Sequence, residues 1–188
     1  MKLYHGSSLG GLAELKPALS EHGRPYVYLA TNPVVALLYA VKPVPKPFSF
    51  YPYGFDAQGA VVYSEYWENA FSALYQGKTG YLYTCERINP RQNPTEINCA
   101  YTCETPVKVD GCLEIADVYE QFIRFAREGR FRLKPYTKIS RQELNMVHDE
   151  LLLTIRKYRL KDDPAHPMSR FIQEHFLPLW LQAGEQTP

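Results

Sequence analysis

The pattern of apolar and polar residues predicts strands along the first two thirds of the chain and helices along the last third. Residues 26–31 and 80–86 form aromatic-rich runs, and residues 60–66 alternate between apolar and polar side chains. Both patterns are typical of strands, and a short strand carrying His5 precedes them. We expect further strands at 48–53, 97–102, 106–109 and 113–116. The pattern predicts an α+β protein with a mostly antiparallel β core.

A buried helix is predicted directly after the strand at 26–31. Asn32 can cap the first free backbone N–H groups, and Pro33 suits the first helical position, where no N–H is needed. The residues from Val34 to Val41 are apolar nearly all round, so this helix should be buried. Residues 12–17, before that strand, are expected to form a loop with at most one helical turn.

Local capping signals predict three helices in the last third of the chain. Asp117 can cap the first of them, and Ser140 with Glu143 three residues later fits a capping box. Pro178 should kink or end the last one. The expected ranges are 118–127, 140–158 and 167–181. We therefore divide the chain into a core domain at 1–119 and a helical C-terminal extension at 120–188 that packs on the core.

Composition and charge exclude some partners. The chain has 188 residues, of which 45% are hydrophobic and 22% charged, and its net charge of +1 does not indicate binding to a nucleic-acid backbone. No apolar run is long enough to cross a bilayer, and the start lacks a signal-peptide layout. We therefore expect a cytoplasmic protein with no membrane partner. The basic residues between Arg124 and Lys138 are expected to form a solvated helix face, or else to steer an anionic target.

The cysteines do not indicate a metal site. Cys85, Cys99, Cys103 and Cys112 include no C-x-x-C pair, and no histidines lie near them at zinc-binding spacing. We expect them to be reduced, partly buried and without a metal.

His5, Gly6 and Ser7 are the first residues that could carry chemistry. A histidine near a strand end is often only structural, but a glycine directly after it would let a ligand approach the backbone closely. A strand backbone can pair with both sides of a planar carboxamide, and Ser7 adds a hydroxyl. Tyr28 and Tyr39 lie on the adjoining strand and helix, where their rings could stack on an aromatic ligand or simply pack in the core.

The chain resembles the ADP-ribosyltransferase superfamily in three places: Tyr4-His5-Gly6-Ser7, the strand at 26–31 with Tyr28, and the following helix with Tyr39. The likeness is to the branch with a His-Tyr-Glu signature, which includes poly(ADP-ribose) polymerases and diphtheria toxin. The rifampin ADP-ribosyltransferases are also similar around these motifs. The likeness covers mainly residues 2–41. It implies an ADP-ribosyltransferase-like split antiparallel β core, with NAD as substrate and no metal.

The resemblance implies a role for each matching residue. His5 and Gly6 would hold NAD through its ribose hydroxyl and its carboxamide, while Tyr28 and Tyr39 would flank the nicotinamide ring. The family also places an acid at the edge of a later strand, where it stabilises the positive sugar that forms as nicotinamide leaves. Glu104, between the predicted strands at 97–102 and 106–109, is the expected acid.

Other acids and one departure from the family pattern bear on that choice. Glu65, Glu68 and Glu86 compete with Glu104 for the role, and Glu104 could also be an ordinary surface carboxylate. The toxin branch often has Gln or Glu two residues before its acid, whereas this chain has Thr102, which argues against transfer to arginine.

The resemblance implies an NAD-dependent ADP-ribosyltransferase that releases nicotinamide and transfers ADP-ribose to an unidentified acceptor, which could be a protein, a nucleic acid or a small molecule. One alternative is a non-catalytic module that binds NAD or ADP-ribose. A third is an RNA 2′-phosphotransferase-like enzyme, although its extra histidine and arginine motifs are not found in the first hundred residues.

Overall fold

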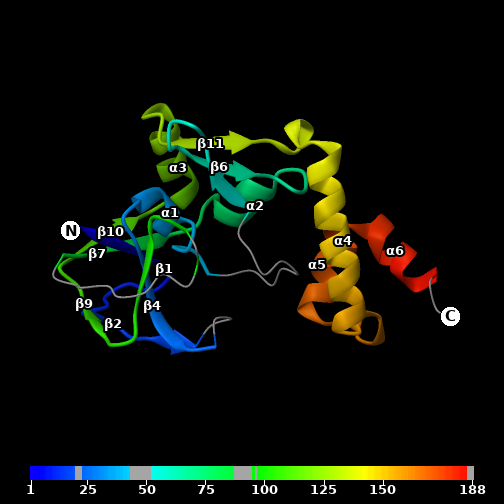
Figure 1. Cartoon of the computed structure of the whole chain (residues 1–188), viewed down its shortest axis with the longest axis horizontal. Coiled ribbons are helices and arrows are strands. Elements are labelled where there is room, and N and C mark those ends of the chain that lie inside the picture. The colour runs from blue at the N-terminus through cyan, green and yellow to red at the C-terminus, as the bar shows by residue number, and fades with distance from the viewer. Residues whose placement is uncertain (20–22, 43–51, 87–94, 96, 186–188) are drawn as a thin grey trace. The chain divides into compact units, whose positions relative to one another are not determined.

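The structure is a computed structural model that describes residues 1–19, 23–42, 52–86, 95 and 97–185 (Figure 1). The chain forms two compact units, one of residues 1–43 and 71–131 and the other of residues 44–70 and 132–188. The division into domains at 1–119 and 120–188 is a different one and stays a prediction. Within the described residues, no helix combines the length and apolar character needed to cross a membrane.

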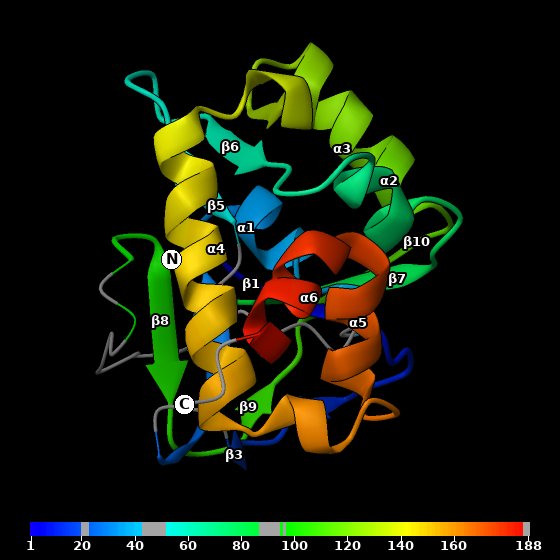
Figure 2. The same ribbon diagram turned by 90° about the vertical axis from the view of Figure 1, so that its right-hand side faces the viewer.

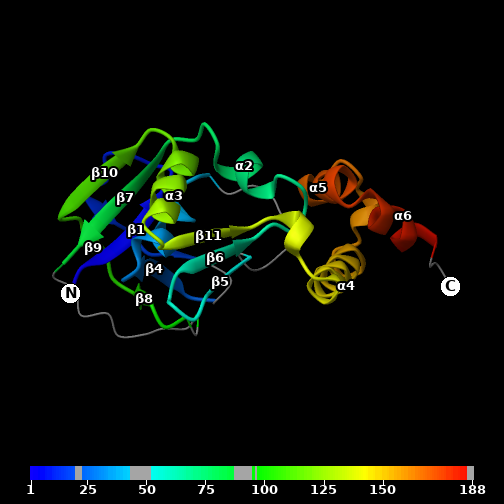
Figure 3. The ribbon, with the colours of Figure 1, turned by 90° about the horizontal axis from the view of Figure 1, so that it is seen from above.

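The first unit is built on an antiparallel sheet with the strand order β10-β7-β1-β4-β3, and β8 also pairs with β4. Figure 3 shows the order of β10, β7, β1 and β4 across the sheet. A separate two-stranded ribbon joins β2 to β9. The elements are β1 (Leu3–Ser7), β2 (Glu14–Leu15), β3 (Ala18–Leu19), β4 (Pro25–Ala30), α1 (Pro33–Leu37), α2 (Ala70–Tyr75), β7 (Gly80–Cys85), β8 (Ala100–Cys103), β9 (Val107–Lys108), β10 (Gly111–Ile115) and α3 (Val118–Arg127).

The two faces of this sheet pack against different partners. Alternate side chains of a strand point to opposite faces. One face packs against the β2–β9 ribbon through Leu3, Leu15, Val27, Leu29, Tyr83, Cys85 and Val107. The other face is covered by α1, which contacts β1, β4 and β7. A second aromatic cluster of this unit joins α2 to α3, where Phe71 lies 5.0 Å from Phe122 between ring centroids.

The second unit combines a small sheet, in the order β11-β6-β5, with the C-terminal helices. α4 packs against α6, and α6 packs against α5 (Figure 2). Trp67 stacks on His175 with ring centroids 5.1 Å apart and contacts Phe171 edge-on. The elements are β5 (Tyr53–Phe55), β6 (Val61–Ser64), β11 (Phe131–Lys134), η1 (Tyr136–Lys138), α4 (Arg141–Lys157), η2 (Leu160–Asp162), α5 (Pro167–His175) and α6 (Leu177–Glu185).

The structure confirms an α+β protein with mainly antiparallel sheets and a helical C-terminal segment. Asp117 caps α3 through hydrogen bonds from the backbone N–H groups of Tyr119 and Glu120, as expected. The capping box of Ser140 and Glu143 is also present at the start of α4.

Several local expectations were wrong. Residues 12–17 contain β2, because Glu14 and Leu15 pair with β9, far along the chain. The helix after Asn32 ends at Leu37 instead of reaching Val41. The single helix expected at 167–181 is two helices, because the backbone at Phe176 is not helical. Most of the strand expected at 48–53 lies outside the described residues.

The basic residues between Arg124 and Lys138 do not form one helix face. Arg124 and Arg127 belong to α3, but Arg132 and Lys134 lie on strand β11, which the sequence pattern did not predict. Arg132 pairs with Asp56 at 3.1 Å, and Lys134 pairs with Glu143. Arg132 and Lys134 therefore form ion pairs within the second unit.

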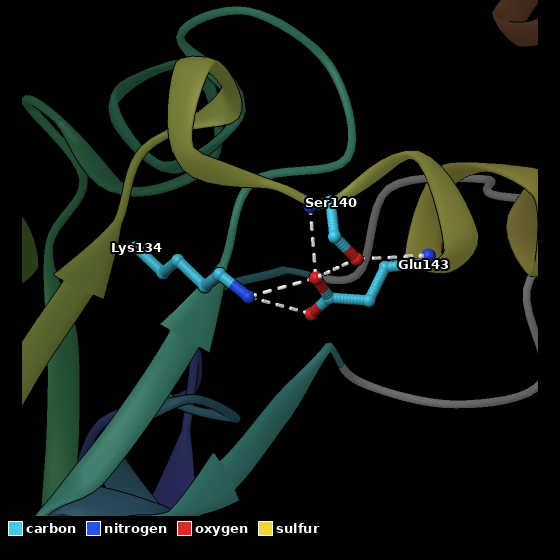
Figure 4. A network of polar contacts seen from close by, with 3 residues as sticks. All are labelled: Lys134, Ser140 and Glu143. Atoms are coloured by element: carbon cyan, nitrogen blue, oxygen red, sulfur yellow. Dashed lines mark hydrogen bonds and ion pairs between the residues drawn. The ribbon is translucent and has the colours of Figure 1, made fainter.

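Glu143 joins β11 to the first turn of α4 (Figure 4). Its carboxylate accepts hydrogen bonds from Lys134 Nζ at 2.7 and 2.8 Å and from the backbone N–H of Ser140 at 2.9 Å. These bonds, first that from Lys134, lower the pKa of Glu143 from 4.5 to about 2. Because the folded pKa lies below the unfolded one, the stabilisation is complete above pH 4.5 and is lost as the pH falls toward 2.

We expect Glu143→Gln to lower the free energy of unfolding by about 1 kcal/mol at pH 7, since glutamine keeps the capping geometry but loses the ion pair. The difference from wild type should shrink when urea unfolding is repeated at pH 2.5. Asp149→Asn, an exposed change on the same helix, is the control and should alter neither value. A difference that persists unchanged at pH 2.5 would rule out this electrostatic explanation.

Candidate functional site

His5 lies where β1 and β4 separate. In the described chain the two strands are in register at Tyr4 and Ala30. One residue further, the side chain of His5 bonds to the β4 backbone, with Nδ1 2.8 Å from the carbonyl oxygen of Tyr28. A carbonyl oxygen can only accept, so the bond assigns the proton to Nδ1 and leaves a lone pair on Nε2 of the neutral ring. The imidazole therefore bridges two strand edges while keeping one acceptor.

The surroundings of His5 favour its neutral form. Burial lowers the pKa of His5, and the hydrogen bond to Tyr28 opposes that shift without reversing it. The uncharged ring is thus the main species at pH 7. In that form Nε2 can accept a hydrogen bond from a hydroxyl group.

The backbone of Gly6 faces the side on which β1 and β4 have separated. On β7, the carbonyl of Thr84 accepts from the N–H of Asp110 at 2.9 Å, so the peptide groups of Thr84 point toward β10. Tyr4 of β1 is paired with Thr84, so the N–H and C=O of Tyr4 must point away from β7 and toward β4. Gly6, two residues on, has the same orientation. Its N–H and C=O thus face the diverging edge of β4.

The missing side chain of Gly6 is explained by helix packing. A Cβ placed on Gly6 would lie 1.9 Å from the carbonyl oxygen of Ala36, near the end of α1. The glycine is therefore required so that α1 can lie directly on β1. From the sequence alone, the glycine is expected to serve the close approach of a ligand. The space on the Cβ side instead belongs to the helix, and a ligand could reach Gly6 only along its backbone edge.

Tyr28 projects to the face of the sheet that α1 covers. Its neighbours Val27 and Leu29 belong to the cluster on the opposite face, so alternation turns Tyr28 toward α1. Its ring meets that of Tyr26 edge-on, with centroids 6.0 Å apart. His5 lies two residues after Leu3 and is paired with Tyr83, and both of these belong to the cluster with Val27 and Leu29, so the His5 side chain lies on the face opposite to the Tyr28 ring. His5 therefore contacts the backbone of Tyr28, whereas the Tyr28 ring lies on the other face of the sheet.

Tyr39 is displaced from the position that the sequence suggested. It lies in the turn after α1, where its N–H bonds to the carbonyl of Ala36 at 3.1 Å. Tyr39 is 42% exposed, whereas Leu38 and Ala40 on either side are fully buried. Tyr39 is thus partly exposed between two buried neighbours, and an aromatic ring can stack on a flat ligand.

Glu104 follows β8, on the edge of β4 opposite to β1. Ala30 pairs with Tyr4 on one side and with Ala100 of β8 on the other, which fixes this arrangement. The Glu104 side chain is about half exposed and forms an ion pair of 3.5 Å with Arg24, just before β4. Two residues earlier, Thr102 is buried and lies directly opposite Tyr28.

The three competing acids occupy different surroundings. Glu65 is only 6% exposed, and its carboxylate accepts from the backbone N–H of Tyr136 at 3.4 Å within the second unit. Glu68 and Glu86 are exposed. Of the four acids, Glu104 is the one that directly follows a strand paired with β4.

One contributor to this region was missed by the sequence reasoning. The hydroxyl of Tyr83, on β7, donates to the carbonyl of Leu9 at 2.8 Å and accepts from the N–H of Leu12 at 3.2 Å. Nothing in the local pattern distinguishes Tyr83 from the other tyrosines, since its role depends on the register of β7 with β1.

In the part of the chain that the structure describes, no group of three or more histidine, cysteine or acidic side chains could hold a metal ion. No family model, curated protein or solved structure matches the chain. The geometry of β1, β4 and β8 is therefore the basis for a functional proposal.

Proposed function

We propose that the unit of residues 1–43 and 71–131 is an ADP-ribosyltransferase-like domain that binds NAD, releases nicotinamide and transfers ADP-ribose to an acceptor. The observation that carries the proposal is the separation of β1 from β4 after Tyr4 and Ala30, with His5 bridging to Tyr28. A neutral imidazole, which can accept a hydrogen bond from a ribose hydroxyl, thus lies beside a strand edge that can pair with a carboxamide.

The carboxamide of nicotinamide pairs with the backbone edge of Gly6. An amide group offers one acceptor and two donor hydrogens, which complement the N–H and C=O of a strand residue. The ordered position of Gly6 between α1 and β7 supports this role, since a rigid edge loses little entropy when the ligand binds.

The remaining contacts hold the ring and the sugar. Nε2 of His5 accepts from a ribose hydroxyl, because Nδ1 is committed to Tyr28. Ser7 Oγ already accepts from the N–H of Leu9 at 3.1 Å, so its own hydrogen can be donated to the ligand. Tyr28 and Tyr39 supply aromatic rings for the nicotinamide, and the exposure of Tyr39 suits that task.

The reaction breaks the bond between the ribose C1′ and the ring nitrogen of nicotinamide. The bonding electron pair goes to that nitrogen, which neutralises the pyridinium and leaves positive charge on the sugar. The acceptor's nucleophilic atom then bonds to C1′ and gives up its proton to the solvent or a base. A carboxylate beside C1′ lowers the barrier by stabilising the positive sugar, and Glu104 has this role.

Glu104 has to exchange its partner to act in this way. Its ion pair with Arg24 is exposed, and such pairs contribute about 0–1 kcal/mol. A small gain from NAD binding is therefore enough to release the carboxylate.

The second candidate is a module that binds NAD without cleaving it. The pairing of Glu104 with Arg24 is the observation that favours it, because a carboxylate held there would not reach the sugar. The two candidates share the contacts of His5 and Gly6 and differ only in the acid.

Replacing Glu104 with glutamine separates the two candidates. For the enzyme, we expect nicotinamide release to fall about 100-fold while the Kd for NAD stays within threefold, because the acid acts mainly in the transition state. Arg24→Ala is the matched control, since it removes the other half of the ion pair and should preserve release. Isothermal titration and a nicotinamide-release assay give both values. Wild-type binding without release would instead favour the module.

A further inference from the structure

The β1–β2 loop (residues 8–13) follows directly from Ser7 and contains two adjacent glycines. Gly11 has a positive φ of 72°, a conformation that favours glycine. Glycine loses more backbone entropy on ordering than any other residue, so this loop needs external contacts to keep one conformation.

Two tyrosines of β7 provide such contacts. The Tyr83 hydroxyl joins the carbonyl of Leu9 to the N–H of Leu12, which closes the loop around the two glycines. The ring of Tyr81 lies so close to Gly10 that an added Cβ would fall 2.6 Å from it. Burial raises the pKa of Tyr83, so its hydroxyl remains protonated and able to donate.

The loop lies in the direction in which a bound dinucleotide has to extend. β1 and β4 are joined at Tyr4 and Ala30, so a ligand seated on Gly6 cannot continue past that end. The strands separate toward Ser7, and the loop continues the chain from there. If NAD binds at Gly6 as proposed, its sugar-phosphate half leaves Gly6 along Ser7 and the β1–β2 loop.

We propose that Tyr83 is a positioning residue for NAD: its hydroxyl fixes the β1–β2 loop in the conformation that receives the sugar-phosphate half of the ligand. This inference rests on the proposed function. It adds a residue that never touches the substrate and acts on affinity through the loop.

The test is Tyr83→Phe, which keeps the buried ring and removes both loop hydrogen bonds. We expect the Kd for NAD to rise about tenfold, as the loss of one to two hydrogen bonds implies, and the rate of nicotinamide release at saturating NAD to stay within twofold. Hydrogen exchange at the Leu12 amide, whose acceptor is lost, should become faster in the absence of NAD. Tyr81→Phe is the matched control, because it removes a hydroxyl from the same strand but leaves both Tyr83 bonds in place, and all three values should stay at wild type.

The outcomes separate this inference from the function on which it rests. Faster exchange at Leu12 with an unchanged Kd would overturn the positioning role while leaving the proposed function intact. An equal loss of affinity in Tyr81→Phe would also overturn it, by showing that any hydroxyl of β7 has the same effect. Failure of the wild-type chain to bind NAD would overturn both the proposed function and this inference.

Discussion

Replacing His5 with alanine is expected to lower kcat/KM for nicotinamide release by at least about 100-fold, because the ribose loses the group that orients it. The chain should stay folded, since the imidazole is partly buried and contributes one hydrogen bond between β1 and β4. Circular dichroism and urea unfolding report the fold, and the release assay reports activity.

His5→Asn separates binding of the ligand from bridging of the strands. The asparagine amide can donate to the Tyr28 carbonyl in place of Nδ1, but it has no acceptor at the position of Nε2. We expect this variant to regain the stability lost in His5→Ala while remaining inactive. If His5→Asn recovers activity, the histidine serves only to hold the strands together.

The largest effect on stability is expected for Gly6→Ala. The new Cβ would lie 1.9 Å from the Ala36 carbonyl oxygen, so α1 has to move off the sheet. Overpacking of this kind costs about 3 kcal/mol, which urea unfolding can measure directly. Because the clash is with backbone, a rotamer change cannot relieve it.

Gly54→Ala is the control for Gly6→Ala. Gly54 also lies in a strand, but no atom lies within 4 Å of an added Cβ. Its stability should stay within about 1 kcal/mol of wild type. Wild-type stability in Gly6→Ala would mean that α1 does not rest on β1 as described.

Features set by local chemistry could be predicted from the sequence, because their signals lie within a few residues of each other. Asp117 begins α3, and Ser140 with Glu143 begins α4, each through a side chain that satisfies nearby backbone N–H groups. The helix that begins at Pro33 was also expected, although not its end at Leu37. Beyond that point the backbone N–H groups of Leu38, Tyr39 and Ala40 each bond three residues back.

Features set by strand pairing could not be predicted in this way. Leu15 forms a strand only because Val107 lies opposite it, and no nearby residue indicates that partner. The direction of the Tyr28 side chain follows from its place in β4. The sequence could therefore suggest that its ring lines a site, but not on which face of the sheet the ring lies. The packing reason for a glycine at position 6 is likewise distant in the sequence, because the carbonyl of Ala36, which an added Cβ would meet, lies thirty residues away.

If the backbone edge of Gly6 receives a carboxamide where β1 and β4 separate, the Gly6 amide must respond to the ligand. The wild-type chain can be titrated with nicotinamide and with NAD while its backbone amides are followed by NMR. We predict a saturable shift of the Gly6 amide with both ligands and no change at Gly54. Binding of NAD that leaves the Gly6 amide unmoved, or no binding of either ligand at millimolar concentration, would contradict this placement of the carboxamide.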